Sequence, residues 1–444
     1  MLTALLLGNL AAPPAPLSLN DALQRALACS PEMHQAELES RRARVVADGT
    51  HAERFSYSGQ LAVGNYSGVF GLFGNSAPTP IVAPIGNATL LARWPLFTGF
   101  RLDHQISQAE ASVTASQARA QHVRQQLVWQ VTQAYWAARR AELRAATQQE
   151  AMTRAQTARD LVRSSFQLGR AHAAELDRAE VTLLTEESEA LKASDEARRA
   201  RDQLASLLQR DILGVPLQDP PAPTAGDPVS LQVSLAKARE RRPDLRLAEA
   251  DLAAKQAGVG VAAAEKLPQL EAISAYQHGN NPFIPTSQNR NVLPNLVGTW
   301  DARLNLSYNL FDHGVIQRNI QAQQLQASAS EAALEAARRS AELEVKQAHA
   351  QLALARRRLQ IGQRSVALAT RNLAWLENRY RYGYALVTEL NEARQSLKLA
   401  SHQQIDARID HALAIASLAR ATGEWAPDLP LQAGLMATST LEVP

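Results

Sequence analysis

The segment Tyr380–Ala400 reads Y-R-Y-G-Y-A-L-V-T-E-L-N-E-A-R-Q-S-L-K-L-A. One glycine, Gly383, stands between two tyrosines, and beyond it apolar residues return at spacings of three and four, which is the period of an α-helix. We therefore expect the chain to arrive as a helix, to turn at Gly383 and to leave as a second helix.

The same arrangement occurs earlier in the chain, where F-Q-L-G-R-A-H-A-A-E-L-D-R-A runs from Phe166 to Ala179. Aligning Gly169 with Gly383 gives an offset of 383 − 169 = 214 residues, which also pairs Glu175 with Glu389. A repeat of this length predicts two copies of one structural unit. We expect the copies at 17–212 and 229–423, a proline-rich linker at 213–228, a signal-peptide remnant with a proline-rich start at 1–16, and a tail at 424–444.

Composition and charge exclude several classes of function. The 46 basic residues nearly balance the 43 acidic ones, so there is no electrostatic case for a nucleic-acid partner. The histidines are scattered, no cluster has metal-ligand spacing, and no glycine-rich phosphate loop follows a strand. We expect no enzyme activity, cofactor or metal site. The single cysteine, Cys29, excludes an intrachain disulfide, and we expect it to be a buried helical residue rather than a lipidation site.

Apolar and polar residues alternate over Trp300–Phe311, with aromatic residues near both ends. A period of two over about eleven residues is typical of a barrel strand with one face toward lipid and a wet interior. Thr89–Phe97 and Phe55–Tyr66 have the same pattern, and Gln269–Gln277 shows it less clearly. The residues predicted to face lipid are Trp94, Leu96, Trp300, Leu304, Leu306, Tyr308 and Leu310. A soluble sandwich is the alternative, but its buried face has no need of aromatic ends.

The remaining segments divide into loops and helices. Ser67–Ala88 and His278–Leu296 are rich in glycine, proline and asparagine and are expected to be the loops that join each pair of strands. Helices are expected to start after a cap at Ser18 or Asn20 and at its counterpart Ser230. Further helices are expected at Glu32–Glu53, Asp244–Lys266, Ala173–Arg210 and Leu386–Thr422. No interior stretch approaches the roughly 20 apolar residues of a membrane-spanning helix.

After each second strand comes a run of about 67 residues without a proline, which as one helix would be on the order of 100 Å long. Its distal half in the second copy has a heptad pattern at Leu352, Ala355, Leu359, Gly362, Val366, Ala369, Leu373, Leu376 and Tyr380. The first copy keeps most of this seam at Ala138, Ala141, Ala145, Met152, Ala155, Val162 and Phe166, but it places Gln148 and Arg159 there. The helices are therefore expected to lie side by side over their whole length.

The chain resembles the TolC family of outer-membrane efflux proteins in this order of elements and in the Y-x-x-G…E-L-x-x-A turn. It also resembles that family in the junction after each second strand, which reads L-F-T-G at Leu96–Gly99 and L-F-D-H-G at Leu310–Gly314. The resemblance implies a mainly α-helical chain with a membrane β-barrel. In that family three chains contribute four strands each to one 12-stranded barrel in the outer membrane, and their helices form an α-barrel in the periplasm. It also implies a passive exit duct for small molecules such as drugs, toxic compounds or metal ions. The partners implied are a homotrimer, outer-membrane lipid, a periplasmic adaptor protein and an inner-membrane pump.

The resemblance also assigns functional positions. The tips that contact the adaptor would be Leu168, Gly169 and Arg170 in the first copy and Tyr382, Gly383 and Tyr384 in the second. Glu389, Glu392 and Glu175 match acidic gate positions, and Tyr380 matches a gating tyrosine. Ala385 stands where the family has an arginine, which puts the full gate latch in doubt. The alternative is that Glu389 and Glu392 are ordinary solvated helix residues, but we favour rings of carboxylates that hold cations.

Two alternative functions stay open at this stage. A type I protein-secretion channel has the same fold, and the sequence does not separate it from an efflux duct. A soluble coiled-coil scaffold with arginine-rich surfaces is the alternative from another class, but it has no use for amphipathic strands.

Overall fold

The computed structural model describes residues 16–70, 79–169, 171–220, 230–280, 296–382 and 384–424. The chain forms two compact units, each built from both copies of the repeat. The helical unit comprises Met1–Ala36, Arg119–Leu245 and Ala337–Pro444, and the sheet unit comprises Glu37–Ala118 and Arg246–Ala336. None of the helices in the described ranges is long and apolar enough to cross a membrane.

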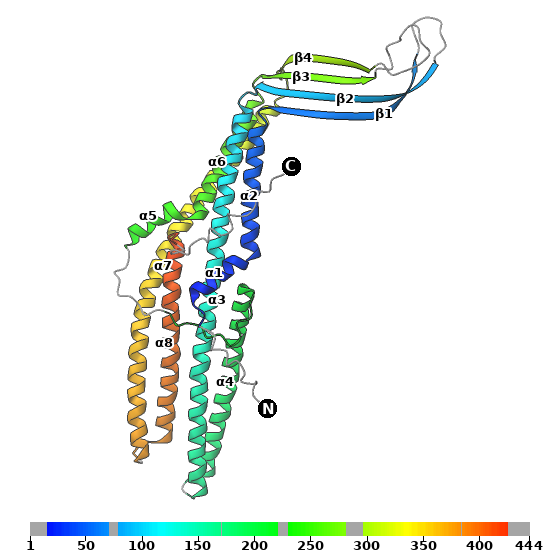
Figure 1. Cartoon of the computed structure of the whole chain (residues 1–444). Coiled ribbons are helices and arrows are strands. Elements are labelled where there is room, and N and C mark those ends of the chain that lie inside the picture. The colour runs from blue at the N-terminus through cyan, green and yellow to red at the C-terminus, as the bar shows by residue number, and fades with distance from the viewer. Residues whose placement is uncertain are drawn as a thin grey trace, which may run out of the picture. The chain divides into compact units, whose positions relative to one another are not determined.

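The elements follow one another in the predicted order, twice. The first copy contains α1 (Leu19–Cys29), α2 (Pro31–Ala52), β1 (Ser56–Phe70), β2 (Thr79–Phe97), α3 (Arg101–Gln167) and α4 (Ala173–Leu208). The second contains α5 (Leu231–Arg241), α6 (Pro243–Ala264), β3 (Gln269–Asn280), β4 (Leu296–Ser307), α7 (Val315–Arg381) and α8 (Val387–Ala421). Both long helices, α3 and α7, hold 67 residues as predicted (Figure 1).

The four strands form one antiparallel sheet in the order β1-β2-β3-β4, so β1 and β4 are its edges. Across the sheet Trp94 pairs with Ala272, and Ala272 pairs with Leu304. Because side chains alternate between faces, this register places the predicted lipid-facing residues of the strands together. Trp94, Trp300, Leu304 and Leu306 are indeed exposed large apolar residues. The opposite face holds an ion pair between Arg93 and Glu271 at 2.9 Å, with the buried Ile273 directly across from Arg93.

The predicted strand ends were partly wrong. Tyr308 and Leu310 lie beyond β4, which ends at Ser307 because its only partner, β3, begins at Gln269 opposite that residue. In the other direction, β1 and β2 extend into the predicted loop Ser67–Ala88 and pair from Ser56 opposite Arg93 to Phe70 opposite Thr79. The part of β2 that precedes Asn87 pairs with β1 but not with β3, so its other side is an open edge. Pro80 and Pro84 fall in this part, and prolines are tolerated at such an edge. The loop predicted at His278–Leu296 is likewise shortened, since β3 continues to Asn280.

The L-F-T-G junction of the first copy, Leu96–Gly99, is a close approach of backbone to backbone. Gly99 has φ +62°, and a Cβ placed on it would lie 2.8 Å from the carbonyl oxygen of Ala264 and from Cβ of Leu267. Both the dihedral angle and the lack of space therefore require glycine where β2 leads into α3.

The predicted heptad seam of α7 is confirmed as the buried face of that helix. Leu352, Ala355, Leu359, Leu373 and Leu376 are buried. Gly362 allows close packing, because a Cβ there would be 3.2 Å from Cα of Gln404 in α8. In the first copy the polar exception, Gln148, is buried and its amide donates to the Glu186 carboxylate at 2.5 Å. Phe166 differs from the prediction and is exposed.

The largest apolar cluster of the helical unit surrounds Tyr135 on α3. This fully buried side chain packs with Val128, Val131 and Leu204, and its hydroxyl lies 2.8 Å from the carbonyl oxygen of Leu17. The same hydroxyl accepts a hydrogen bond from the backbone N–H of Gln218 at 2.9 Å. Tyr135 therefore ties the start of the first copy to the segment that follows α4. Burial raises its pKa to about 12.

Cys29 is the last residue of α1, as expected for a helical position. Its predicted burial was wrong, because the thiol is exposed. The buried face of α1 is formed by Ala22, Leu23 and Ala26. Cys29 follows Ala26 by three residues, but it is the last residue of α1, and the buried face ends before it.

We expect Tyr135→Phe to lower the free energy of unfolding by about 0.5–1.5 kcal/mol, because it removes the hydroxyl's hydrogen bonds to the part-buried backbone of Leu17 and Gln218, which then keep only their bond to each other at 3.2 Å. The midpoint of thermal unfolding, followed by circular dichroism in detergent, measures this loss. Tyr57→Phe is the matched control, since Tyr57 is exposed on the sheet. Equal midpoints for Tyr135→Phe and the control would contradict this role of the hydroxyl.

Candidate functional site at the helical turns

The two turns expose apolar side chains at the ends of the helical hairpins. Gly169 has φ +69°, and a Cβ there would meet no atom within 4 Å, so glycine serves the backbone angle rather than close packing. Leu168, Tyr382 and Tyr384 are 68%, 77% and 73% exposed, which is unusual for side chains of this size. Arg170 and Gly383 lie outside the described residues.

The second turn is held by Arg379, a residue that the sequence analysis did not single out. Its guanidinium donates to the carbonyl oxygen of Tyr384 at 3.0 Å and lies 4.7 Å from the ring centroid of Trp375. Its carbonyl oxygen accepts from the backbone N–H of Tyr384 at 2.9 Å. The spacing of four between Trp375 and Arg379 on a helix was the available signal for the cation–π contact.

The predicted gate carboxylates lie within the first two turns of the returning helices. Glu389 accepts a hydrogen bond from the backbone N–H of Leu386 at 3.1 Å, so within the chain it caps the start of α8. Glu392, three residues on, shares its side of the helix and is exposed. Glu175 occupies the equivalent position in the first turn of α4 and is also exposed. Three carboxylates are thus near the turns.

Tyr380 is half-buried in the seam between α7 and α8, where it packs against a cluster that contains Leu376, Leu390 and Ala393. Arg394 lies nearby on α8, and its Nε is buried without a hydrogen-bond partner in the described part of the chain. Burial lowers the pKa of this guanidinium, while Glu377 and Tyr380 raise it and Arg154 lowers it further. A second arginine, Arg154 on α3, is therefore close enough to repel Arg394.

Farther from the turns, a row of polar side chains joins α3 to α8. We call it the polar seam, and it consists of Arg140, Arg144 and Gln148 on α3, Glu186 on α4, and Lys398, His402, Asp406 and Asp410 on α8. Arg140 contacts Asp410 at 2.5 Å, and Arg144 contacts Asp406 at 2.6 Å. Lys398 lies 2.8 Å from Glu186.

Of the residues in the polar seam, only Gln148 stands out in the sequence, as a polar residue in an otherwise apolar heptad pattern. The missed signal was a spacing of four in both helices, at residues 140, 144 and 148 and at residues 398, 402, 406 and 410. Such spacing puts each set on one stripe of its helix. Nothing in the sequence, however, shows that stripes more than 200 residues apart face each other.

His402 lies within the polar seam, and its Nε2 is buried without a hydrogen-bond partner in the described ranges. Burial lowers its pKa from the ordinary 6.5, and Arg144 and Lys398 lower it further, whereas Asp406 and Glu186 raise it. His402 is therefore held in its neutral form at neutral pH.

A group whose pKa is lower in the folded state than in the unfolded state stabilises the fold above its unfolded pKa and loses that contribution as pH falls. We expect the thermal midpoint of the protein to fall between pH 7 and pH 5, and to fall less in His402→Gln. His172→Gln is the control, because His172 is exposed at the start of α4. The same pH dependence in both variants would exclude His402 as a source of this acid sensitivity.

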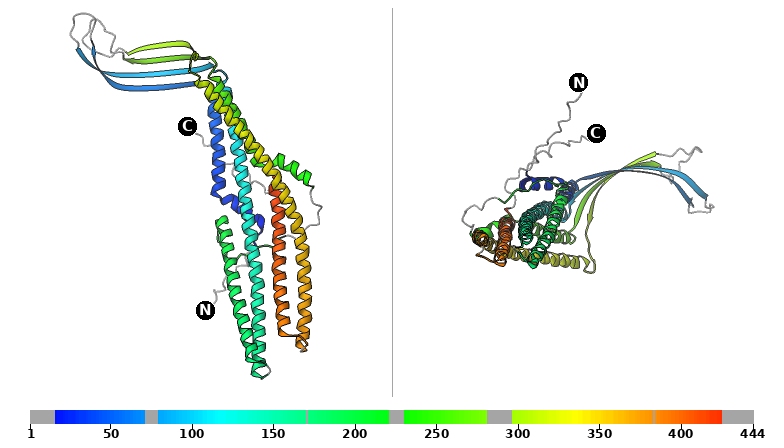
Figure 2. Two further views of the ribbon diagram at one scale, coloured as in Figure 1. Left: turned by 180° about the vertical axis from the view of Figure 1, so that it is seen from behind. Right: turned by 90° about the horizontal axis from the view of Figure 1, so that it is seen from below.

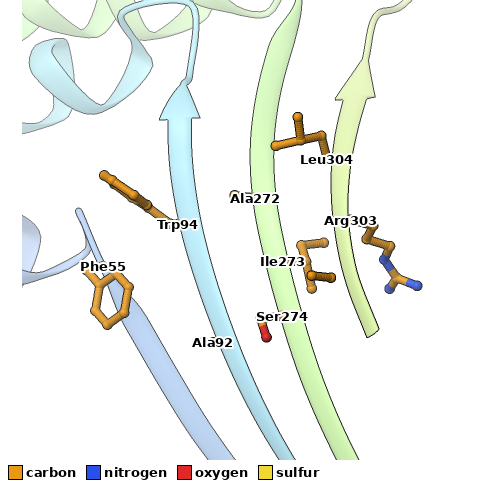
Figure 3. A pocket seen from close by; sticks show the side chains of 9 residues that line it. Phe55, Ala92, Trp94, Ala272, Ile273, Ser274, Arg303 and Leu304 are labelled. Atoms are coloured by element: carbon orange, nitrogen blue, oxygen red, sulfur yellow. The ribbon is translucent and has the colours of Figure 1, made fainter. Parts of the chain in front are cut away.

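The described residues contain no group of three or more side chains suited to a metal ion. A cavity of about 330 Å³ lies on the sheet, far along the chain from either turn (Figure 3). Its lining is mainly apolar and small, with Ala92, Ala272 and Ala302 between Trp94 and Leu304. Arg303 is its one charged residue, so the lining brings together no acid–base pair.

Comparisons with known proteins agree with this arrangement. The family model described as outer membrane efflux protein matches residues 22–209 and 235–424. None of the curated proteins matches the sequence.

Several solved structures have the same fold over nearly the whole chain. The CmeC outer membrane channel of Campylobacter jejuni is 17% identical with a TM-score of 0.79, over 91% of this chain and 85% of that chain. The outer membrane protein VceC of Vibrio cholerae is 17% identical with a TM-score of 0.76, over 91% and 96%. The MtrE outer membrane channel of Neisseria gonorrhoeae, in an open state, is 21% identical with a TM-score of 0.72, over 91% and 88%.

Proposed function

Because this chain belongs to the outer membrane efflux protein family and is the outer-membrane exit duct of a tripartite efflux system, we propose that three copies form one duct. Its sheets close a barrel in the outer membrane, and its helices extend into the periplasm. The observation that carries this proposal is the four-stranded sheet with an apolar face and two open edges. Unpaired strand edges are costly in lipid, and pairing β1 of one copy with β4 of the next removes them.

The duct carries the small molecules that its inner-membrane pump delivers, and it selects among ions at its narrow end. Threefold symmetry turns Glu389 and Glu392 into two rings of three carboxylates, with Glu175 of the first copy close to the same end of the helices. Rings of acidic side chains concentrate cations in a pore. Tyr380 supports this gate from the seam behind it, since it packs on the helix that bears both carboxylates.

We expect the assembled protein to form cation-selective pores in a planar bilayer, and multivalent cations to block them from the side of the turns. Glu389→Ala/Glu392→Ala should abolish the block and reduce the selectivity, because both rings lose their charge. Glu187→Ala/Asp202→Ala is the matched control, as it removes two exposed carboxylates of α4 that are remote from the turn. Unchanged block in the first variant would show that the rings are not the gate.

The turns themselves are the surface that contacts the periplasmic adaptor. Leu168, Tyr382 and Tyr384 offer exposed apolar contacts, and Arg379 fixes the backbone that presents Tyr384. Gly169 and Gly383, with Arg170 beside the first, complete the two tips. An apolar end on an otherwise charged pair of helices suits a helical hairpin of a partner protein.

A photoreactive residue at position 384 should capture the adaptor in cells, because Tyr384 is exposed at the tip. The same residue at Gln363, exposed in the middle of α7, is the control and should capture little of it. Mass spectrometry of the product identifies the adaptor. Capture at 363 but not at 384 would contradict docking at the tips.

A further inference from the structure

The cavity on the sheet opens on its apolar face. Its floor consists of the small side chains of Ala92, Ala272, Ser274 and Ala302. Ala92 pairs with Ser274, and Ser274 pairs with Ala302, so these three lie side by side on β2, β3 and β4. Ala272 lies two residues before Ser274 and therefore on the same face. We call this cavity the sheet slot (Figure 3).

Large apolar side chains form the walls of the sheet slot. Trp94 and Leu304 flank Ala272, because both pair with it across the sheet. Phe55, directly before β1, completes the lining beside Trp94 (Figure 3). The three wall side chains are between 51% and 69% exposed, so they project from the sheet and leave the floor open.

The polar group of the floor is satisfied within the sheet. The indole N–H of Trp300 donates to the hydroxyl of Ser274 at 3.0 Å, so Trp300 reaches across from β4 to β3. Ile273 and Arg303 also line the cavity, but they alternate with the floor positions and belong to the opposite face. The slot therefore presents an apolar surface that suits a hydrocarbon chain.

The slot lies near the end of the sheet at which the strands meet the helices (Figures 1 and 2). Ala272 is three residues from the start of β3, and Leu304 is three residues from the end of β4. A strand rises about 3.3 Å per residue, so both lie about 10 Å from that end. In the proposed duct the helices extend into the periplasm, and this part of the sheet crosses the periplasmic leaflet of the outer membrane. The molecules that reach the slot are the phospholipids of that leaflet.

Two opposite charges stand beside one wall of the slot. Arg54 directly precedes Phe55, and its guanidinium lies 3.8 Å from the carboxylate of Asp103 on α3. The two side chains are 65% and 63% exposed, so each can take another partner at little cost. A guanidinium binds phosphate through paired hydrogen bonds, and a carboxylate accepts hydrogen bonds from an ammonium group. The pair therefore matches a zwitterionic head group, whereas a purely anionic one is repelled by Asp103.

We propose that the sheet slot binds an acyl chain of phosphatidylethanolamine, with the phosphate at Arg54 and the ammonium group at Asp103. This inference rests on the proposed duct and adds to it a lipid site that one chain builds alone. An unfilled hollow leaves the floor residues without contacts on one side, and an acyl chain supplies those contacts. The two charges then determine which lipid supplies the chain.

Native mass spectrometry of the full chain in detergent, with phosphatidylethanolamine added, measures the lipid that each copy retains. Ala272→Phe fills the floor between Trp94 and Leu304, and we expect it to lower the retained lipid about tenfold, because the ring takes the place of the acyl chain. Ala88→Phe is the matched control, because Ala88 lies on the same face of β2 but outside the lining.

A second variant, Ala302→Phe, fills the slot from the edge strand β4, where position 302 is exposed. It takes the place of Ala272→Phe if that variant fails to fold. Equal retention of phosphatidylethanolamine by the slot-filling variant and by the control would overturn the lipid site.

The head group is tested with two other lipids. Phosphatidylglycerol and lipid A carry phosphate but no ammonium group, and we expect the unmodified protein to retain each about fivefold less, which corresponds to one exposed ion pair. Asp103→Asn removes the carboxylate and should abolish this preference. Retention of either lipid at the level of phosphatidylethanolamine in the unmodified protein would overturn the assigned occupant.

The oligomeric state in the same spectra separates this inference from the proposed function. Trimers that retain no phosphatidylethanolamine would overturn the lipid site and leave the duct intact. A monomer of the unmodified protein that retains the lipid would overturn the trimeric duct and support the site, because all of its lining belongs to one chain.

Discussion

The alternation of large and small side chains along the inner seam of α7 is the constraint on which the helical unit depends. A helix of 67 residues is not stabilised by its own hydrogen bonds alone, and it needs a partner along its length. Leu359 and Leu373 fill the seam, while Ala355 and Gly362 let α8 approach closely. This packing fixes which faces of the hairpin stay free to meet other helices.

The two copies of the repeat have kept this packing and changed the chemistry around it. In the first copy the seam includes a buried glutamine, Gln148, which is satisfied by Glu186, and Glu186 in turn contacts Lys398. In the second copy the equivalent of Gln148 is Gly362. The contacts of Gln148, Glu186 and Lys398 therefore join the first helical hairpin to the second. Gly362 makes no such contact and instead lets the backbones of α7 and α8 approach closely.

Much of this fold followed from local sequence patterns. The caps Ser18 and Ser230, the seam of α7 and the turn at Gly169 depend on residues within one or two helical turns of each other, and all are found in the described structure. The end of β4 was missed because it is set by where β3 begins, not by the alternation, which continues to Leu310. The polar seam was missed for a similar reason, since Arg144 and Asp406 meet only after both hairpins have formed. Whether Glu389 belongs to a gate depends on other copies of the chain, which a single sequence pattern does not place.

The charges of the polar seam differ from apolar contacts in what their separation costs. Arg144 and Asp406 are each about one-third exposed, so water screens their attraction and can solvate them again when α3 and α8 part. An apolar face loses roughly 25 cal/mol for every Å² returned to water, and no solvent interaction compensates for it. Separating α3 from α8 along the polar seam therefore costs less free energy than separating an apolar contact of the same area.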